Sequence, residues 1–247
     1  MKKILITGGT GLLGKEIVKG FLEKNCIVYF TTTSKKKSID FLNDIDELKR
    51  KYCIPIVQKF DNIKQIDSFI KRYKNYNFNV LINNARNISN LKSKNKISEQ
   101  SNNFSSEFFL AVQLPYFLSN NLNHKYLSQI VNISSMYGVV SPNKNLYEDG
   151  YNSSSIFYGV SKAAEIRLTK ELSVRLAHKK IRVNSISFGG FEGRVNKKFK
   201  KKYSEMCPLG RMLQPKEVFD PIWFLSSDQS SGAIGHNLVI DGGWTIW

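Results

Sequence analysis

The sequence predicts one α/β domain in which a doubly wound parallel sheet of about seven strands carries helices on both faces. Two observations predict it. Short apolar runs alternate with helical patterns along the whole chain, which is the order of βαβ units. No internal repeat or linker-like change of composition divides residues 1–247, and a chain of 247 residues can enclose one large core.

Each expected strand is a short run rich in β-branched and aromatic residues, and each expected helix has apolar residues three or four apart. The first strand is 4–6, and the helix after it carries an apolar stripe from Ile17 to Leu22. The other strands are expected at 26–32, 54–60, 80–82, 130–133, 182–187 and 237–240. The other helices are expected at 38–51, 63–74, 103–123, 157–178 and 215–226, with polar, irregular segments at 86–102, 138–156 and 189–214.

The turn after the first strand, TGGTGLLG at 7–14, is rich in glycine. Gly8, Gly11 and Gly14 have the spacing G-x-x-G-x-x-G between a strand and a helix. Such a turn lets the backbone approach a pyrophosphate, and the helix N-terminus presents free N–H groups and a partial positive charge. The context therefore predicts a Rossmann-like dinucleotide site rather than a flexible turn.

The composition limits the classes of partner. The net charge of +17 requires that nucleic acid and anionic membranes be considered. We interpret it as a solvated basic face, because the lysines are spread over surface-like positions. No nucleic-acid or membrane partner is therefore expected, and no apolar stretch approaches the length of a membrane span.

The cysteines and the N-terminus bear on location. Cys26, Cys53 and Cys207 are scattered and share no ligand spacing. This predicts a reducing compartment, the cytoplasm, without a disulfide framework or metal site. The run MKKILI resembles the start of a signal peptide, but it breaks at Thr7 without a cleavage site and is better interpreted as the first strand.

Several separated motifs together resemble the short-chain dehydrogenase/reductase family, in its single-domain, short-subunit form. The motifs are TGGTGLLG at 7–14, NNA at 83–85, IVNISS at 130–135, YGVSK at 158–162, IRVNSIS at 181–187 and the C-terminal PLGRM, FLSSD and IDGGW. They occur in the family's order and cover essentially the whole chain. The resemblance implies an NAD(P)-dependent oxidoreductase.

The resemblance also implies catalytic roles. Tyr158 would exchange a proton with the substrate oxygen, and Lys162, one helical turn later, would favour the phenolate and hold the nicotinamide ribose. Ser135, the second serine of the pair, would donate a hydrogen bond to the same oxygen. The family's fourth catalytic residue is an asparagine, and here Gln113 stands in its place.

The end of the second strand bears on cofactor choice. An NAD-preferring enzyme usually has Asp or Glu there, whereas this chain has three threonines, Ser34 and lysines. The absence of an acid favours NADP over NAD, with NAD as the alternative. The residues expected to bind the cofactor are Gly8, Thr10, Gly11, Leu12, Leu13, Gly14, Thr32, Thr33, Ser34, Lys35, Asp61, Asn62, Asn83, Ala85, Lys162, Ser187 and Gly189.

Two further segments point to the substrate. Ser135 and Tyr158 are 23 positions apart, so a segment at about 138–157 is expected to loop out beside the site. Residues 189–214, which contain a lysine run at 197–202, occupy the place of the family's substrate lid. The motifs are similar to those of oxidoreductases of bacterial surface-sugar and flagellin-modification pathways, which implies a sugar-type substrate, phosphorylated or nucleotide-linked. The residues expected to contact substrate are Ser135, Tyr147, Tyr158 and Gly190.

Two alternatives remain open. The glycine spacing is that of epimerases and dehydratases, which retain their cofactor. The charge would also suit a non-catalytic, cofactor-sensing module that binds an anionic polymer. By resemblance, we expect a dimer or tetramer.

Overall fold

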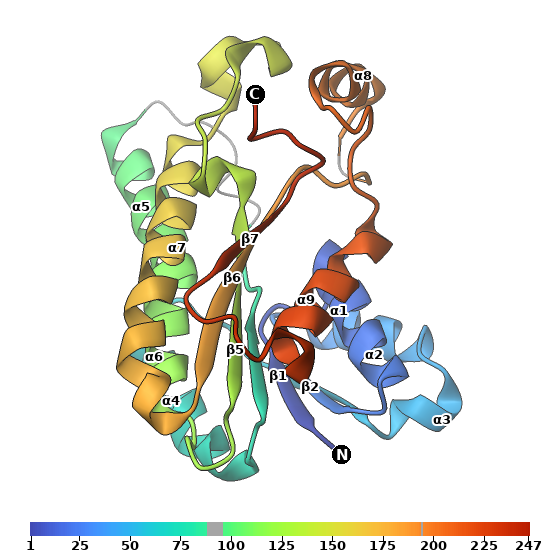
Figure 1. Ribbon diagram of the computed structural model, residues 1–247, viewed down its shortest axis with the longest axis vertical. Coiled ribbons are helices and arrows are strands. Elements are labelled where there is room, and N and C mark those ends of the chain that lie inside the picture. Colours follow the sequence, from blue (N-terminus) through green and yellow to red (C-terminus); the bar gives the residue numbers. More distant parts are fainter. Residues whose placement is uncertain (88–95, 194) are drawn as a thin grey trace.

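The computed structural model describes residues 1–87, 96–193 and 195–247, and its centre is a parallel sheet (Figure 1). The strands are β1 (Lys3–Ile6), β2 (Ile27–Thr32), β3 (Cys53–Val57), β4 (Val80–Asn83), β5 (Gln129–Ser135), β6 (Arg182–Phe188) and β7 (Asn237–Ile240). Their order is β3-β2-β1-β4-β5-β6-β7, and every pairing is parallel. The predicted doubly wound fold is confirmed. The strand order reverses between β1 and β4, where such sheets open a crevice at their carboxyl ends.

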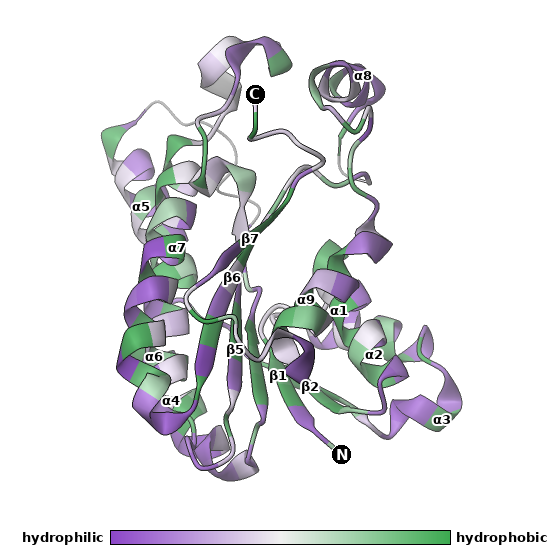
Figure 2. Ribbon diagram, viewed as in Figure 1, coloured by the Kyte–Doolittle hydropathy of each residue, from purple (hydrophilic) through white to green (hydrophobic). Residues whose placement is uncertain are grey.

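Helices cover both faces of the sheet (Figure 1). One face carries α1 (Leu12–Glu23), α2 (Lys35–Asn43) and α9 (Phe219–Ser226), and the other carries α4 (Ile63–Tyr73), α5 (Ile97–Phe108), α6 (Leu114–Asn121) and α7 (Ile156–Leu176). A hydrophobic core therefore lies on each face of the sheet. Phe21, Phe30 and Phe41 lie in the first, and Phe69 and Leu118 lie in the second. Figure 2 shows the hydrophobic colour on β1 and β2 between these layers.

The expected helix at 38–51 is two helices. α2 ends at Asn43, and α3 (Glu47–Arg50) begins after Asp46, whose carboxylate accepts from the Leu48 amide at 2.9 Å. The apolar spacing of a single helix continues across this break. For that reason the periodicity predicted one helix instead of two. Asp46 is an N-cap, because a short acidic side chain satisfies amides that lack helical partners.

The expected helix at 103–123 starts earlier and is interrupted. α5 already begins at Ile97, so 97–102 is helical rather than loop, while 88–95 of the expected loop lie outside the described residues. A π-helical turn, Phe109–Gln113, separates α5 from α6. Pro115 follows this turn and has no N–H to donate to the carbonyl four residues earlier. The wider turn accommodates that lost bond.

The expected irregular segment at 189–214 contains a helix, α8 (Lys197–Met206). Asn196 caps it by accepting from the Phe199 amide at 2.8 Å. Tyr203 is 1% exposed and stacks on Trp244, with ring centroids 4.5 Å apart. The prediction was wrong because the lysines dominate the sequence pattern, whereas one tyrosine anchors the helix.

Among the described residues, no helix is both long enough and apolar enough to cross a bilayer.

Candidate active site

A cavity of about 1010 Å³ extends from the glycine turn to the start of α7, at the carboxyl ends of the central strands. It brings together many residues that the sequence singled out. Those that line it are Gly8, Thr10, Gly11, Leu12, Leu13, Gly14, Thr32, Thr33, Asp61, Ala85, Gln113, Tyr158 and Lys162. Residues far apart in the sequence thus share one cavity, because parallel strands bring their carboxyl ends to one edge of the sheet.

At Gly8 and Gly14 the glycine turn is packed too closely against its neighbours for a side chain. A Cβ at position 14 would lie 2.2 Å from the carbonyl oxygen of Gly8, which itself has φ +72°. The turn is held from β2, where the Thr31 hydroxyl accepts from the Gly8 amide at 3.0 Å. α1 begins at Leu12, directly after the turn. The first amides of α1 have no partner within the helix and are available to a ligand at the turn. This cradle fits the pyrophosphate of a dinucleotide.

The NNA motif after β4 holds the same turn from its other side. The Thr7 hydroxyl accepts from the amides of Asn84 and Ala85, both at 2.9 Å. The Asn84 side chain donates to the carbonyls of Thr7 and Gly8, each at 3.1 Å. Asn83 is buried away from the cavity lining and donates to Asn132 at 2.7 Å. Asn84, which the sequence analysis did not select, is the asparagine that supports the cradle.

The far end of the cavity carries hydroxyls and two lysines. Thr33, Lys37 and Lys59 line it, and Lys59 is paired with Asp61 at 2.8 Å. Lys35 is exposed and does not line the cavity. Lys37 lies there instead.

Ser34 and Asn62 act as helix caps. Ser34 accepts from the Lys37 amide at 3.2 Å, and Asn62 accepts from the Gln65 amide at 3.1 Å. Neither residue lines the cavity.

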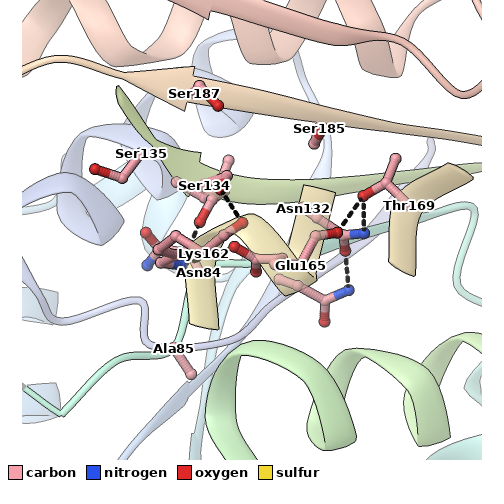
Figure 3. A network of polar contacts seen from close by, with 12 residues as sticks. Asn84, Ala85, Asn132, Ser134, Ser135, Lys162, Glu165, Thr169, Ser185 and Ser187 are labelled. Atoms are coloured by element: carbon pink, nitrogen blue, oxygen red, sulfur yellow. Dashed lines mark hydrogen bonds and ion pairs between the residues drawn. The ribbon is translucent and has the colours of Figure 1, made fainter. Parts of the chain in front are cut away.

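At the other end, Tyr158 and Lys162 lie in the first turns of α7. The Lys162 ammonium is buried and donates to the Ile133 carbonyl at 2.6 Å and to Glu165 Oε2 at 2.8 Å (Figure 3). Glu165 is 2% exposed, and burial raises the pKa of its carboxyl to about 7 although Lys162 acts in the opposite direction. Residue 165 was missed by sequence reasoning. Its signal was an acid three positions after the lysine on the same helix.

The two serines at the end of β5 use their hydroxyls for different hydrogen bonds. Ser134 lines the cavity and donates to the Lys162 carbonyl at 3.0 Å. Ser135 does not line it, and its hydroxyl accepts from the Tyr137 amide at 3.2 Å. Figure 3 shows the two side chains pointing in different directions, as alternation along a strand requires.

Four other selected residues lie outside the cavity lining. The Ser187 hydroxyl donates to Asn237 at 2.9 Å. Gly189 and Gly190 pack on Tyr203, whose hydroxyl accepts from the Gly190 amide at 2.9 Å. The hydroxyl of Tyr147 lies 2.7 Å from that of Tyr137, and burial raises the pKa of Tyr147.

Arg86, directly after the NNA motif, is a further residue that the sequence analysis missed. It lines the cavity, and its guanidinium carbon lies 3.6 Å from the centroid of the Tyr158 ring. The sequence feature that could have revealed Arg86 is a positively charged residue immediately after the NNA motif.

Comparisons with known proteins find oxidoreductases that resemble the whole chain. The family model described as enoyl-(acyl carrier protein) reductase matches residues 11–245. The chain is 28% identical over 262 residues to post-translational flagellin modification protein A of Campylobacter coli, covering 99% of this chain and 98% of that protein. It is also 28% identical over 258 residues to a 3-oxoacyl-[acyl-carrier-protein] reductase of Thermotoga maritima, covering 99% and 98%.

A solved structure extends the likeness to three dimensions. The structure of a short-chain dehydrogenase from Leptospira borgpetersenii with bound NAD⁺ is 29% identical, with a TM-score of 0.80, and the match covers 99% of this chain and 92% of that one. Nicotinamide cofactor use and oxidoreductase activity follow from the matched family and its structural neighbours. The chain belongs to the short-chain dehydrogenase/reductase family.

Proposed function

We propose that the chain is an NADP-preferring oxidoreductase that acts on a hydroxyl or keto group of a sugar-type substrate. One observation carries the proposal: Tyr158 and Lys162 line the same cavity as the glycine cradle. The bound cofactor would supply or accept the hydride at nicotinamide C4. In the oxidative direction, the alcohol carbon loses this hydride, its hydroxyl loses a proton and a carbonyl remains.

The side chains would divide the proton chemistry between them. Tyr158 would take the hydroxyl proton, and the Lys162 charge would favour the phenolate that accepts it. By the resemblance, Ser135 would donate to the substrate oxygen, although its side chain lies outside the cavity lining. Its hydroxyl hydrogen is not used in accepting from Tyr137, whereas Ser134, which lines the cavity, donates its own to the Lys162 carbonyl. Gln113 lies in the π-helical turn and lines the cavity. Its side-chain amide would hold a water near the catalytic residues.

The lysines at the far end support the preference for NADP. Lys37 lines the cavity beside Thr33, with no acid at the end of β2 to accept from a ribose 2′-hydroxyl. We expect Lys37→Gln to lower the ratio of kcat/KM with NADP to kcat/KM with NAD by about tenfold, since one charge-assisted contact to a 2′-phosphate is lost. Lys36→Gln, at an exposed neighbour outside the lining, is the matched control. An unchanged ratio in Lys37→Gln would contradict the assignment.

The substrate class rests on the surroundings of the cavity and on the flagellin modification protein among the relatives. We propose that 189–214 form a substrate lid and that 138–157 form the facing wall. Polar and aromatic contacts join them: Lys198 pairs with Glu148 at 3.1 Å, the Lys202 ammonium donates to the Asn145 carbonyl at 3.2 Å, and the ring of Phe199 packs on that of Tyr147. A panel of phosphorylated, nucleotide-linked and neutral sugars, followed by nicotinamide absorbance, tests this class. Turnover of 3-oxoacyl thioesters and of no sugar would overturn it.

We also propose that the protein works in the cytoplasm as a dimer or tetramer. Its three cysteines are free and buried, as suits a reducing compartment. Val160 and Val174 on α7 and Tyr116 on α6 are exposed apolar side chains on the layer through which we expect subunits to pair. Light scattering of the purified protein distinguishes these states from a monomer.

A further inference from the structure

Arg86 places a cation on the face of the residue proposed as the acid/base. The guanidinium carbon lies 3.6 Å from the Tyr158 ring centroid. Its Nε and Nη2 atoms are buried and have no hydrogen-bond partner among the described residues. The same side chain lines the cavity, so it borders the space where a substrate meets Tyr158.

The charge of Arg86 is not balanced within the described part of the chain. Arg86 is half-buried, and enclosing two of its nitrogens without a partner is costly because arginine remains protonated in proteins. No ion pair of Arg86 occurs among the described residues. The nearby cation Lys162 is paired with Glu165, and Lys59 at the far end is paired with Asp61. Contact with an aromatic face offsets only part of the cost.

We propose that Arg86 binds an anionic group, a carboxylate or phosphate, that belongs to the substrate and is attached close to the reacting carbon. The guanidinium fork matches both anions. Nε and Nη2 are enclosed in this structure, so the side chain would turn toward the cavity to bring them to the anion. Because Arg86 stacks on the ring whose hydroxyl meets the reacting oxygen, the anionic group lies close to that oxygen in the bound substrate. This inference rests on the proposed function and narrows its substrate to a hydroxy acid, sugar acid or sugar phosphate.

The test uses glycolate as the probe, because its carboxylate is bonded directly to a hydroxylated carbon. Ethylene glycol has the same size and no charge. Each is titrated by calorimetry into the full chain saturated with NADP⁺, at constant ionic strength. We expect the wild type to bind glycolate at least tenfold more tightly than ethylene glycol, and Arg86→Gln to lose about 30-fold in glycolate affinity. Arg86→Lys, which keeps the charge but not the fork, is expected to lie between them.

A second measurement separates the substrate's anion from those of the cofactor. Fluorescence titration with NADPH is expected to give Arg86→Gln a Kd within twofold of the wild type, whereas Lys37→Gln is expected to weaken NADPH and leave glycolate unchanged. Equal glycolate affinity in wild type and Arg86→Gln, no glycolate binding in wild type, or weaker NADPH binding in Arg86→Gln would each overturn the proposal. Hydride transfer from the sugar panel is a separate readout, so the proposed function can fail while this anion site stands.

Discussion

Replacing Tyr158 by Phe lowers kcat by about a thousandfold, which is the usual scale of a lost acid/base group. Phe keeps the aromatic ring, so the contact with the Arg86 guanidinium at 3.6 Å remains possible and binding should persist. KM and the Kd for NADPH are therefore expected to stay within a few-fold of the wild type. Steady-state rates and fluorescence titration measure the two effects separately.

Tyr151→Phe is the matched control for that variant. Tyr151 is 63% exposed and lies before α7, outside the cavity lining, so its loss should leave kcat unchanged. If Tyr158→Phe kept the wild-type rate, another group would carry the proton and the assignment of Tyr158 would be wrong. Equal losses in both variants would indicate a general effect of tyrosine removal in this region.

Replacing Glu165 by Leu lowers the free energy of unfolding by about 3–5 kcal/mol, because the buried Lys162 ammonium loses the carboxyl group that accepts its hydrogen bond at 2.8 Å. For a chain of this size, such a loss corresponds to a fall in Tm of roughly 10 °C. Denaturant titration and thermal melting measure it. Glu171→Leu is the control on the same helix, since the ion pairs of Glu171 with Arg167 and Arg175 lie at the surface. Similar shifts in both variants would contradict a special role for the buried pair.

The pH dependence of stability tests the same pair. Burial, the largest cause, raises the pKa of Glu165 from 4.5 to about 7, and the buried carboxyl of Glu107 acts in the same direction. Lys162 and Ser134 oppose the shift. The folded state therefore holds this proton more tightly than the unfolded state does, so the contribution to stability is complete below about pH 4.5 and is lost as pH rises through 7.

Glu165→Gln removes this titration with little change of shape. The difference in unfolding free energy, wild type minus variant, is expected to decrease between pH 5 and about 7.5. Denaturant titrations at several pH values measure it. A difference that is constant across this window would show that the carboxyl ionises with an ordinary pKa in the folded protein.

Much of the fold followed from local pattern. Apolar runs such as Ile4–Ile6, separated by helical periodicity, give βαβ units, and parallel pairing is then the only short, right-handed way to connect them. The boundaries of helices were predicted less well from this pattern, because capping residues determine where a helix begins and ends. Asp46 caps the start of a second helix within 38–51, and Asn196 caps the start of a helix within a basic segment. Each effect depends on one side-chain hydrogen bond, which periodicity does not register.

The candidate site shows the same division. Gly8, Gly14, Tyr158 and Lys162 could be selected from sequence because their spacing carries a local geometry: a turn that feeds a helix, and two residues on one helical face. Their common cavity confirms that they lie together, while their roles remain predictions. Lys37 rather than Lys35 faces the cavity because α2 begins at Lys35 and its rotation sets which lysine points inward.

The sequence by itself determined the architecture, the pyrophosphate cradle and the pairing of a tyrosine with a lysine on α7. Only the tertiary structure decided what surrounds that pair. Arg86 and Tyr158 are 72 positions apart, and Glu165 becomes significant only through its burial beside Lys162. The physical reason is that stacking, desolvation and ion pairing depend on distance and burial in the folded chain, and neither quantity is encoded in local spacing.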